Sequence, residues 1–463
     1  MNCKKRILSV VAVVLCTAAA VVYGAGDVNP VGTMQPAQST EGLFANHKET
    51  IYFWYTDEDM TSFVNSAAVS FGEQRNVRVI PVLTSEGEYL EAINQATLHT
   101  DQMPDVYLME SSSLEKAYLA GLAGEISDAG EVCNTAYFPQ AALYAVTYRD
   151  KKLAYPLYFE TSALLYNKSY LEQWAEQQEA GLEDSEAENP EGSGQGEEAM
   201  LSVEELDYLR KGNFDTLDDL LYVANTFDVP EGVEGIMRWD VSDIFYNYWF
   251  AGHYLVVGGT CGDDRSRIDL DNPEAIQCLK TYQTLNQFFS METDTITYES
   301  VLQDLIDGKI MFTVATSDAI KHMEEAREKG ECDFDYGFSM MPDITEELDS
   351  SSLAVTNCVV VNGYSASKEL ANAFATYLAQ DCAEELFQRT GKVPARLNTD
   401  PDNEAVQTFK EEYRYSAALP KMMEAGNYWM QMEVLFAKIW NGEDVEYLMG
   451  ALAEQMQTQL STR

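Results

Sequence analysis

The chain has 463 residues, which is too long for one ordinary hydrophobic core, so two or more domains are expected. Its 76 Asp and Glu against 30 Lys and Arg give a formal net charge of −46, and this field disfavours nucleic acid and anionic lipid as partners. The 27 Tyr and 6 Trp supply rings for a core and, in surplus, for a carbohydrate or peptide cleft.

The N-terminal sequence is typical of an exported protein. Lys4, Lys5 and Arg6 precede an apolar stretch that ends in small residues, so residues 1–25 are predicted to be a signal peptide or membrane anchor. Cys16 leaves a lipid anchor open, although Leu15 is not the small residue that lipidation favours; a cleaved signal and an uncleaved helix are the alternatives. Residues 26–48 are predicted to be a flexible tether. The mature protein is therefore expected outside the cytoplasm, at the cell surface or the membrane.

Strands alternate with helices between residues 50 and 120. Runs rich in β-branched and aromatic residues at 50–55, 77–83 and 103–109 predict strands, and helical spacing predicts helices at 86–98 and 112–120. This alternation predicts an α/β fold with a mainly parallel sheet flanked by helices, and such sheets bind ligands beyond the carboxyl ends of their strands. The residues at those ends are Trp54, Tyr55, Asp57, Glu110 and Ser111.

Each of these residues also has a structural interpretation. Strand alternation sends either Trp54 or Tyr55 into the core. Asp57 precedes a predicted helix, where a helix cap is the commoner role, and Glu110 and Ser111 fit a cap as well as a ligand contact.

The middle of the chain combines two predicted strands with a low-complexity segment. Residues 152–158 and 163–166 are predicted to be separate strands, with Phe159 and Glu160 in the ligand-facing loop between them. Residues 175–201 are rich in Glu, Gly and Ser, and we expect them to form an acidic disordered insertion because they cannot bury enough apolar surface to order themselves.

The second half of the chain supplies further candidates. Helices are predicted at 216–225, 272–289 and 300–307, and strands at 309–315, 336–340 and 355–361, with mostly helical sequence after residue 368. Ser317 follows a predicted strand. Trp239, Asp240 and Trp429 suit ring stacking and hydrogen bonding to a sugar, with core packing as the alternative for the rings. Arg396 suits a pair of hydroxyls or a salt bridge equally well.

Several short segments, taken in this order, resemble the extracellular solute-binding proteins of ABC transporters, in particular the sugar-binding branch related to maltose-binding protein. They are a first strand ending in Trp54, the Pro-Asp-Val strand at 103–106, the helix end at 119–126, the strand at 152–158, the Tyr-Asn-Lys segment at 164–168, the Gly-Lys strand at 307–311 and the Gly-x-x-Pro-x-Arg loop at 389–396. The resemblance covers residues 49–459.

The resemblance implies a two-lobed, type II periplasmic-binding-protein-like fold, with the lobes joined by a hinge. We expect lobe 1 to contain residues 49–150 and 297–350, and lobe 2 to contain residues 151–296 and 351–463. The expected crossings between the lobes lie near 147–155, 292–298 and 349–355.

The function implied by the resemblance is a binding receptor and not an enzyme. The receptor binds a sugar or oligosaccharide between its lobes and, as a monomer, delivers it to an ABC permease. No catalytic residue, metal site or cofactor is expected, since the four His and the scattered Cys lack metal-ligand spacing. Two alternatives stay open: an extracellular glycoside hydrolase, which needs two carboxylates flanking one bond, and a binding protein that signals to a sensor kinase.

Overall fold

A computed structural model describes residues 48–461 except 100–101, 128, 189–200, 290 and 292–295. The predicted signal or anchor, nearly all of the tether and the centre of the acidic insertion lie outside these residues. Within the described residues, no helix combines the length and the apolar character that crossing a membrane would need.

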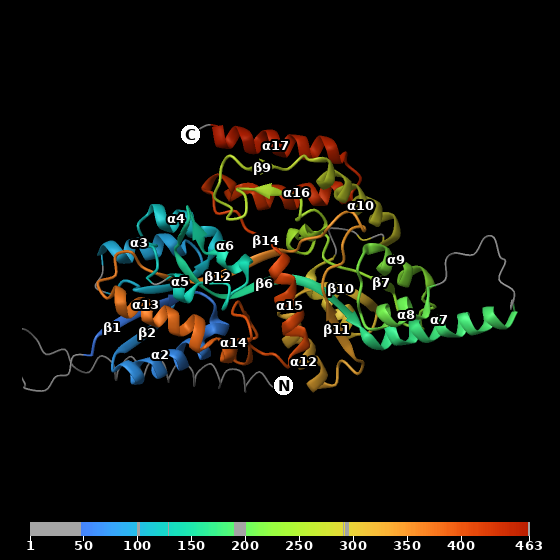
Figure 1. The fold of residues 1–463 in the computed structure, drawn as a ribbon, viewed down its shortest axis with the longest axis horizontal. Helices are drawn as coiled ribbons and strands as arrows, with labels where there is room; N and C mark the ends of the chain where they lie inside the picture. Colours follow the sequence, from blue (N-terminus) through green and yellow to red (C-terminus); the bar gives the residue numbers. More distant parts are fainter. Residues whose placement is uncertain are drawn as a thin grey trace, which may run out of the picture. The chain divides into compact units, whose positions relative to one another are not determined.

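The fold is built on one sheet that runs through both lobes, in the order β2-β1-β3-β12-β6-β10-β7 (Figure 1). Its ten strands are β1 (Thr50–Tyr55), β2 (Arg78–Leu83), β3 (Val106–Glu110), β6 (Ala154–Asn167), β7 (Gly235–Met237), β10 (Ile310–Thr316), β11 (Tyr336–Ser339), β12 (Leu353–Val361), β13 (Val393–Pro394) and β14 (Ala417–Ala418). Two hairpins lie apart, formed by β4 (Thr147–Tyr148) with β5 (Lys151–Lys152) and by β8 (Val256–Val257) with β9 (Ile268–Asp269). Pairing is parallel at β2–β1–β3 and at β7–β10, and antiparallel where β6 meets β12 and β10.

Strand β6 is the element that crosses between the lobes. Its first half pairs with β12 as far as Thr161, and its second half pairs with β10 from Ser162 onward. The sequence prediction of two strands separated by a loop is therefore wrong: the strand continues through residues 159–162, because its backbone pairs with β12 as far as Thr161 and with β10 from Ser162. Pro156, which lacks an N–H donor, is accommodated at a register irregularity opposite Asn357 and Cys358.

Strand pairing also corrects the predicted division into lobes. β12, expected in lobe 2, pairs with β3 of lobe 1, and β10, expected in lobe 1, pairs with β7 of lobe 2. Residues 349–352 lead into β12, and residues 296–297 lead into the helix Tyr298–Ile306, which packs on β10. The expected first crossing near 147–155 precedes the point at Thr161 and Ser162 where β6 changes its partner from β12 to β10. Sequence spacing orders the elements but does not say which strand pairs with which.

Lobe 1 buries apolar side chains on both faces of β1, β3 and β12. Ile51 and Phe53 point into one core layer, and Trp54 packs against the other. Its helical elements are η1 (Glu58–Met60), α2 (Thr61–Arg75), α3 (Tyr89–His99), η2 (Ser111–Ser113), α4 (Leu114–Leu119), α5 (Ala129–Val132), α6 (Gln140–Ala145), α13 (Lys368–Thr376), η5 (Tyr377–Asp381) and α14 (Ala383–Thr390). Figure 1 shows α2, α13 and α14 together beside β1 and β2.

Lobe 2 has the larger aromatic core, in which Trp174, Trp239, Trp249 and Trp440 are fully buried. Its helical elements are α7 (Lys168–Glu188), α8 (Val203–Arg210), α9 (Leu217–Thr226), η3 (Ile244–Tyr246), η4 (Tyr248–Phe250), α10 (Pro273–Phe289), α11 (Tyr298–Ile306), α12 (Ala319–Lys329), η6 (Met423–Asn427), α16 (Tyr428–Trp440) and α17 (Val445–Ser461). α15 (Glu404–Tyr415) contacts both β6 and β11.

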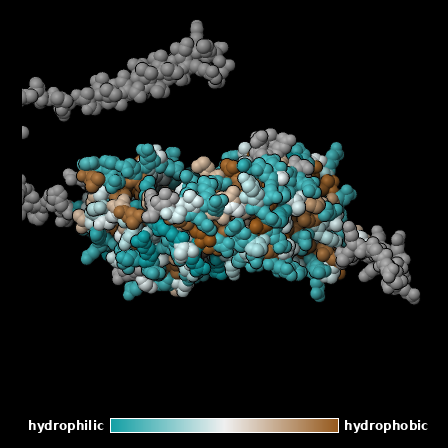
Figure 2. All heavy atoms as spheres, turned by 90° about the horizontal axis from the view of Figure 1, so that it is seen from above, coloured by the Kyte–Doolittle hydropathy of each residue, from teal (hydrophilic) through white to brown (hydrophobic). Residues whose placement is uncertain are grey.

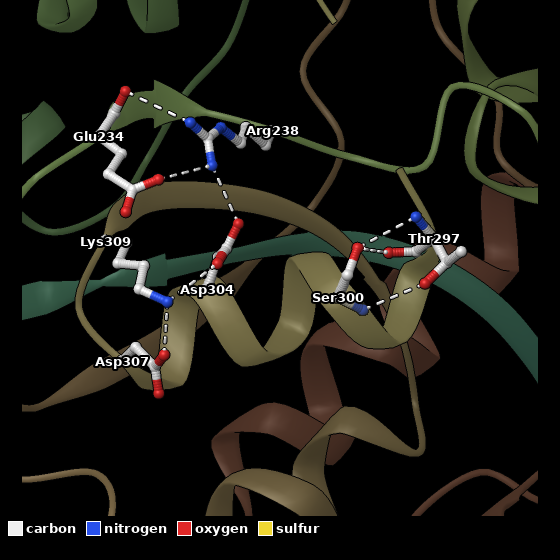
Figure 3. A network of polar contacts seen from close by, with 7 residues as sticks. All are labelled: Glu234, Arg238, Thr297, Ser300, Asp304, Asp307 and Lys309. Atoms are coloured by element: carbon white, nitrogen blue, oxygen red, sulfur yellow. Dashed lines mark hydrogen bonds and ion pairs between the residues drawn. The ribbon is translucent and has the colours of Figure 1, made fainter. Parts of the chain in front are cut away.

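Polar contacts at both ends of α11 fix the start of β10 (Figure 3). At its N-terminus Thr297 and Ser300 form a reciprocal capping box. At its C-terminus Lys309 pairs with Asp304 and Asp307, and Arg238 reaches the other side of Asp304 at 3.0 Å. These contacts hold the C-terminus of α11 against the start of β10 and the end of β7.

Helix α7 corrects the predicted extent of the acidic insertion. It continues to Glu188, so residues 175–188 are helical where the sequence predicts disorder, and Ala175 is fully buried. The physical reason is that α7 packs on α8 and that Arg210 of α8 pairs with Glu172 and Glu179, which holds the helix on both sides of residue 175, where the low-complexity segment begins.

The face seen in Figure 2 is largely hydrophilic, as the composition leads one to expect.

Candidate functional site

Carboxylates gather where β1, β2 and β3 end. A cavity of about 830 Å³ opens at these strand ends, and we call it the acidic cavity. Its acidic lining residues are Asp57, Glu58, Glu86, Glu88, Glu91, Glu110 and Glu160. Lys116 is the one basic residue in its described lining. Within the described part of the chain, no group of three or more His, Cys, Asp and Glu is arranged to hold a metal ion.

A second cavity, of about 660 Å³, lies between the lobes, and we call it the aromatic cavity. Its rings come from lobe 2 and are Phe245, Tyr246, Tyr298 and Trp429. Leu353 and Val355 of β12 and Lys392 from the segment after α14 line it from lobe 1. A ligand held here would touch both lobes.

Glu160 and Lys392 connect the two cavities. Glu160 lines both of them. The Lys392 Nζ lies 3.0 Å from Glu160 Oε1 and 3.2 Å from Asp57 Oδ2, and 5.6 Å from the centre of the Tyr158 ring. Burial by itself lowers the pKa of Lys392, but the charges of Glu160 and Asp57 outweigh it, so its pKa is raised and the ammonium stays charged.

Burial, and after it negative charge, raises the pKa values of the neighbouring groups. Loss of solvent raises the pKa of Glu110; a hydrogen bond from Ser112 lowers it, and the charges of Glu160 and Glu86 raise it further. Burial, followed by the charges of Glu160 and Asp57, raises the pKa of the Tyr158 hydroxyl well above its usual value. The acidic cavity is therefore a region of negative potential in which hydroxyl donors find many acceptors.

The rings of the aromatic cavity are held in fixed orientations. Tyr246 and Tyr298 stack at 4.7 Å, and the Tyr298 hydroxyl donates to Asp318 at 3.2 Å. Trp429 is half-buried and is braced by Tyr248 and Tyr428, whose ring centres lie 5.5 and 4.9 Å away. Rigid rings that still present a face are suited to the apolar faces of a sugar.

Five of the twelve residues predicted from the sequence line these cavities. They are Asp57, Glu110 and Glu160 in the acidic cavity and Ser317 and Trp429 in the aromatic cavity, with Glu160 shared. Asp57 also accepts a hydrogen bond from the N–H of Asp59, so it is a helix cap and a cavity residue at the same time.

Three predicted ligand contacts are core residues instead. Tyr55 and Phe159 point into the lobe 1 core, and Phe159 stacks on Tyr413 at 3.9 Å. Trp239 is fully buried, and its indole donates to Asn247. For Phe159 the reason is the continuity of β6: neighbouring side chains alternate between faces, so Glu160 reaches the cavities and Phe159 cannot.

The remaining four line neither cavity. Trp54 packs on the other layer of the lobe 1 core, and Ser111 is buried in η2. Asp240 accepts from the backbone N–H groups of Ser242, Asp243 and Tyr298, which makes it a structural cap. Arg396 lies over the Tyr137 ring and donates to the carbonyl of Gln380. Their rings and polar groups make contacts within the protein, in the core or as hydrogen bonds to the backbone.

The sequence reasoning missed Lys392, Tyr246 and Tyr298. Lys392 lies in the Gly-x-x-Pro-x-Arg loop, in which the sequence favours Arg396 because Arg can contact two hydroxyls at once. Tyr246 belongs to an aromatic cluster that the sequence marks without saying which ring faces outward. Tyr298 carries no strand-end pattern, and only the packing of α11 against η3 brings it to the cavity.

Comparison with known proteins places this two-lobed fold in a family. Residues 66–411 match the family model described as bacterial extracellular solute-binding protein, and the chain belongs to this family. The resemblance inferred from the sequence motifs is thereby confirmed.

Individual relatives and structures agree with this assignment. The chain is 22% identical over 397 residues to the maltodextrin-binding protein MdxE of Bacillus subtilis (strain 168), with 84% of each chain covered. It is 21% identical over 447 residues to a galactooligosaccharide-binding protein of the same organism, with 92% of this chain and 93% of the relative covered. An extracellular solute-binding protein from Staphylococcus aureus in complex with maltose superposes with a TM-score of 0.71 at 17% identity, covering 89% of this chain and 98% of the other. A cyclo/maltodextrin-binding protein complexed with maltotetraose gives 0.70 at 18% identity, covering 92% and 99%.

Proposed function

We propose that this protein is the extracellular receptor of an ABC importer, and that it binds a neutral sugar or oligosaccharide in the cleft formed by the acidic and aromatic cavities. The observation that carries the proposal is the aromatic cavity, in which Trp429 and Tyr246 face carboxylates across a gap between two lobes. Rings stack on the C–H faces of a sugar, and carboxylates accept hydrogen bonds from its hydroxyls. Asp57, Glu110, Glu160, Ser317 and Trp429 are the binding residues that we propose.

Two lobes joined by crossing strands provide the means of release. A ligand that contacts both lobes binds the closed form more tightly than the open form, so binding shifts the population toward closure. No bond of the ligand needs to change. The names of the two curated relatives and the sugars in the two solved complexes support a carbohydrate as the ligand.

The direct test is calorimetry of the described protein with maltose, maltotetraose, a galactooligosaccharide and, as a non-sugar control, a tripeptide. Binding of at least one glycan, with a rise in melting temperature and no binding of the tripeptide, is the expected result. Binding of the tripeptide alone would overturn the proposal.

Delivery to a permease, a monomeric state and attachment to the membrane are parts of the same proposal. The basic and apolar N-terminal sequence supports export, and membership in an extracellular family agrees with it. Deleting the cognate permease should abolish uptake of the bound sugar and leave its binding to the receptor unchanged. If deleting the receptor instead abolishes gene induction by the sugar while uptake stays normal, a sensor kinase is favoured as the partner.

Hydrolysis can be separated from binding by incubating each oligosaccharide with the protein and analysing the products by chromatography. A receptor leaves the oligosaccharide intact at stoichiometric protein. Shorter products that disappear in Glu110→Gln or Glu160→Gln would show a hydrolase instead.

A further inference from the structure

Lys392 owes its position to strand register. Strand β13 pairs with β6 in an antiparallel arrangement, with Val393 opposite Phe159 and Pro394 opposite Tyr158. Continuing this register by one residue places Lys392 opposite Glu160, on the face that lines the cleft. Gly391 before it has φ of +75° and ends α14, which turns the chain abruptly into β13.

The Lys392 ammonium is shared between two acids from different parts of the chain. Glu160 belongs to β6 and Asp57 follows β1, and both lie within 3.2 Å of the Lys392 Nζ. The side chains are 22% exposed for Lys392, 25% for Asp57 and 37% for Glu160, so solvent screens this contact less than it screens an ordinary surface pair.

The surroundings of these two acids are strongly negative. Seven acidic residues line the acidic cavity against Lys116, and Lys392 is the only basic residue with a described ion pair to any of those seven. Without Lys392, Asp57 and Glu160 would face each other and Glu110 with no opposite charge between them. A cavity of that kind selects cations, as an ammonium ligand would then supply the missing charge.

We propose that Lys392 is a specificity-determining residue, whose ammonium occupies the place between Asp57 and Glu160 that the charged group of an amino sugar would otherwise take, so that the cleft accepts neutral sugars. This inference rests on the proposed function as a sugar receptor and adds the selection of neutral over cationic sugars. Asp57 and Glu160 still have lone pairs that can accept from sugar hydroxyls. A ligand ammonium placed beside them would be repelled by Lys392.

A purely structural role for Lys392 makes a different prediction. If Lys392 only ties β13 to β1 and β6, its loss would weaken the binding of neutral and cationic sugars by the same factor. The ratio of the two affinities therefore distinguishes the roles, whereas a single affinity does not.

The experiment measures that ratio by calorimetry at pH 6 in low salt, where an amino sugar is protonated. The probes are two matched pairs, maltose with maltosamine and lactose with unacetylated lactosamine, in which an ammonium group replaces one hydroxyl. The proteins are the wild type, Lys392→Met, which keeps an apolar chain over the Tyr158 ring, and Lys392→Arg, which keeps the charge.

The matched control is Lys151→Met. Lys151 pairs with a single carboxylate, Glu125 at 3.8 Å, and like Lys392 it lies over a tyrosine ring, Tyr118 at 5.9 Å, but it lines neither cavity. Its removal changes the net charge by the same amount. Circular dichroism melting checks the folding of each variant, and Lys392→Gln replaces Lys392→Met if the latter does not fold.

We expect the wild type to bind the neutral member of a pair at least tenfold more tightly than its amino derivative. Lys392→Met should shift this ratio at least tenfold toward the amino sugar, and Lys392→Arg and Lys151→Met should keep the wild-type ratio. If the wild type binds a neutral sugar but Lys392→Met keeps the ratio within threefold, or Lys151→Met shifts it equally, the inference alone is overturned. If the wild type binds none of the four sugars, the inference is overturned; if it also binds none of the glycans of the direct test, the proposed function fails with it.

Discussion

The two cavities differ in the groups that they would offer to a ligand. The acidic cavity is built from strand ends of lobe 1 and offers hydrogen-bond acceptors, whereas the aromatic cavity is built mainly from lobe 2 and offers ring faces. Glu160 belongs to both because β6 crosses between the lobes. Most of the rings thus come from lobe 2, whereas acidic side chains line both cavities, and only a molecule that reaches across β6 can contact both.

The largest expected effect separates core rings from cleft rings. Trp239→Ala should lower the free energy of unfolding by about 3–5 kcal/mol, because it empties a fully buried site next to Trp440 and Phe289. Urea unfolding followed by circular dichroism measures this loss. At temperatures where the variant is folded, its sugar affinity should stay within threefold of the wild type. A loss of sugar affinity with unchanged stability would show that Trp239 contacts the ligand and is not only a core residue.

The next effect concerns the stability contributed by Glu412, a buried carboxyl group of α15 that lines neither cavity. Burial raises the pKa of Glu412 to about 7, and the N–H of Met341 donates to it at 3.0 Å. In the unfolded chain Glu titrates near 4.3. Between about pH 4.3 and 7 the folded state therefore holds the extra proton, and stability falls as the pH rises through this window by about 4 kcal/mol.

Replacing Glu412 by Gln should remove that part of the pH dependence. Melting temperatures at pH 5 and pH 8 should differ less in Glu412→Gln than in the wild type. Glu411→Gln is the matched control, since the neighbouring Glu411 pairs with Arg414 on the accessible side of α15. An identical pH profile in the wild type and Glu412→Gln would show that Glu412 is ionised in the fold throughout this range.

A smaller effect tests the aromatic cavity directly. Trp429→Ala should weaken the binding of the cognate sugar by about 1–3 kcal/mol, because the sugar loses the half-buried ring on which it stacks. Calorimetry measures the affinity, and Trp429→Phe, which keeps a ring, should recover most of it. Equal affinities in the wild type and Trp429→Ala would locate ring stacking elsewhere in the cleft.

The smallest effect tests the acidic cavity. Glu110→Gln should change the melting temperature by less than about 2 °C, because losing one accessible charge from a repulsive cluster slightly favours the fold. Its sugar affinity should fall by about 0.5–1.5 kcal/mol through the loss of one charged acceptor. A larger loss than in Trp429→Ala would show that acceptors, and not rings, supply most of the binding energy.

Sequence patterns located most elements but not their partners. The strands at 50–55, 309–315 and 355–361 appear within two residues of their predicted bounds, because runs of β-branched and aromatic residues are local information. The assignment of β10 and β12 to lobes failed, because a strand with both faces buried has the same apolar composition in either lobe.

By itself the sequence determined the order of strands and helices, the acidic character of the protein and the residue types at the strand ends, including Asp57, Glu110 and Glu160. Only the tertiary structure decided that Trp239 is buried while Trp429 faces the cleft, and that Lys392 and not Arg396 meets the acids. Which face of an element is covered depends on contacts between residues far apart in the chain, and no local pattern records those contacts.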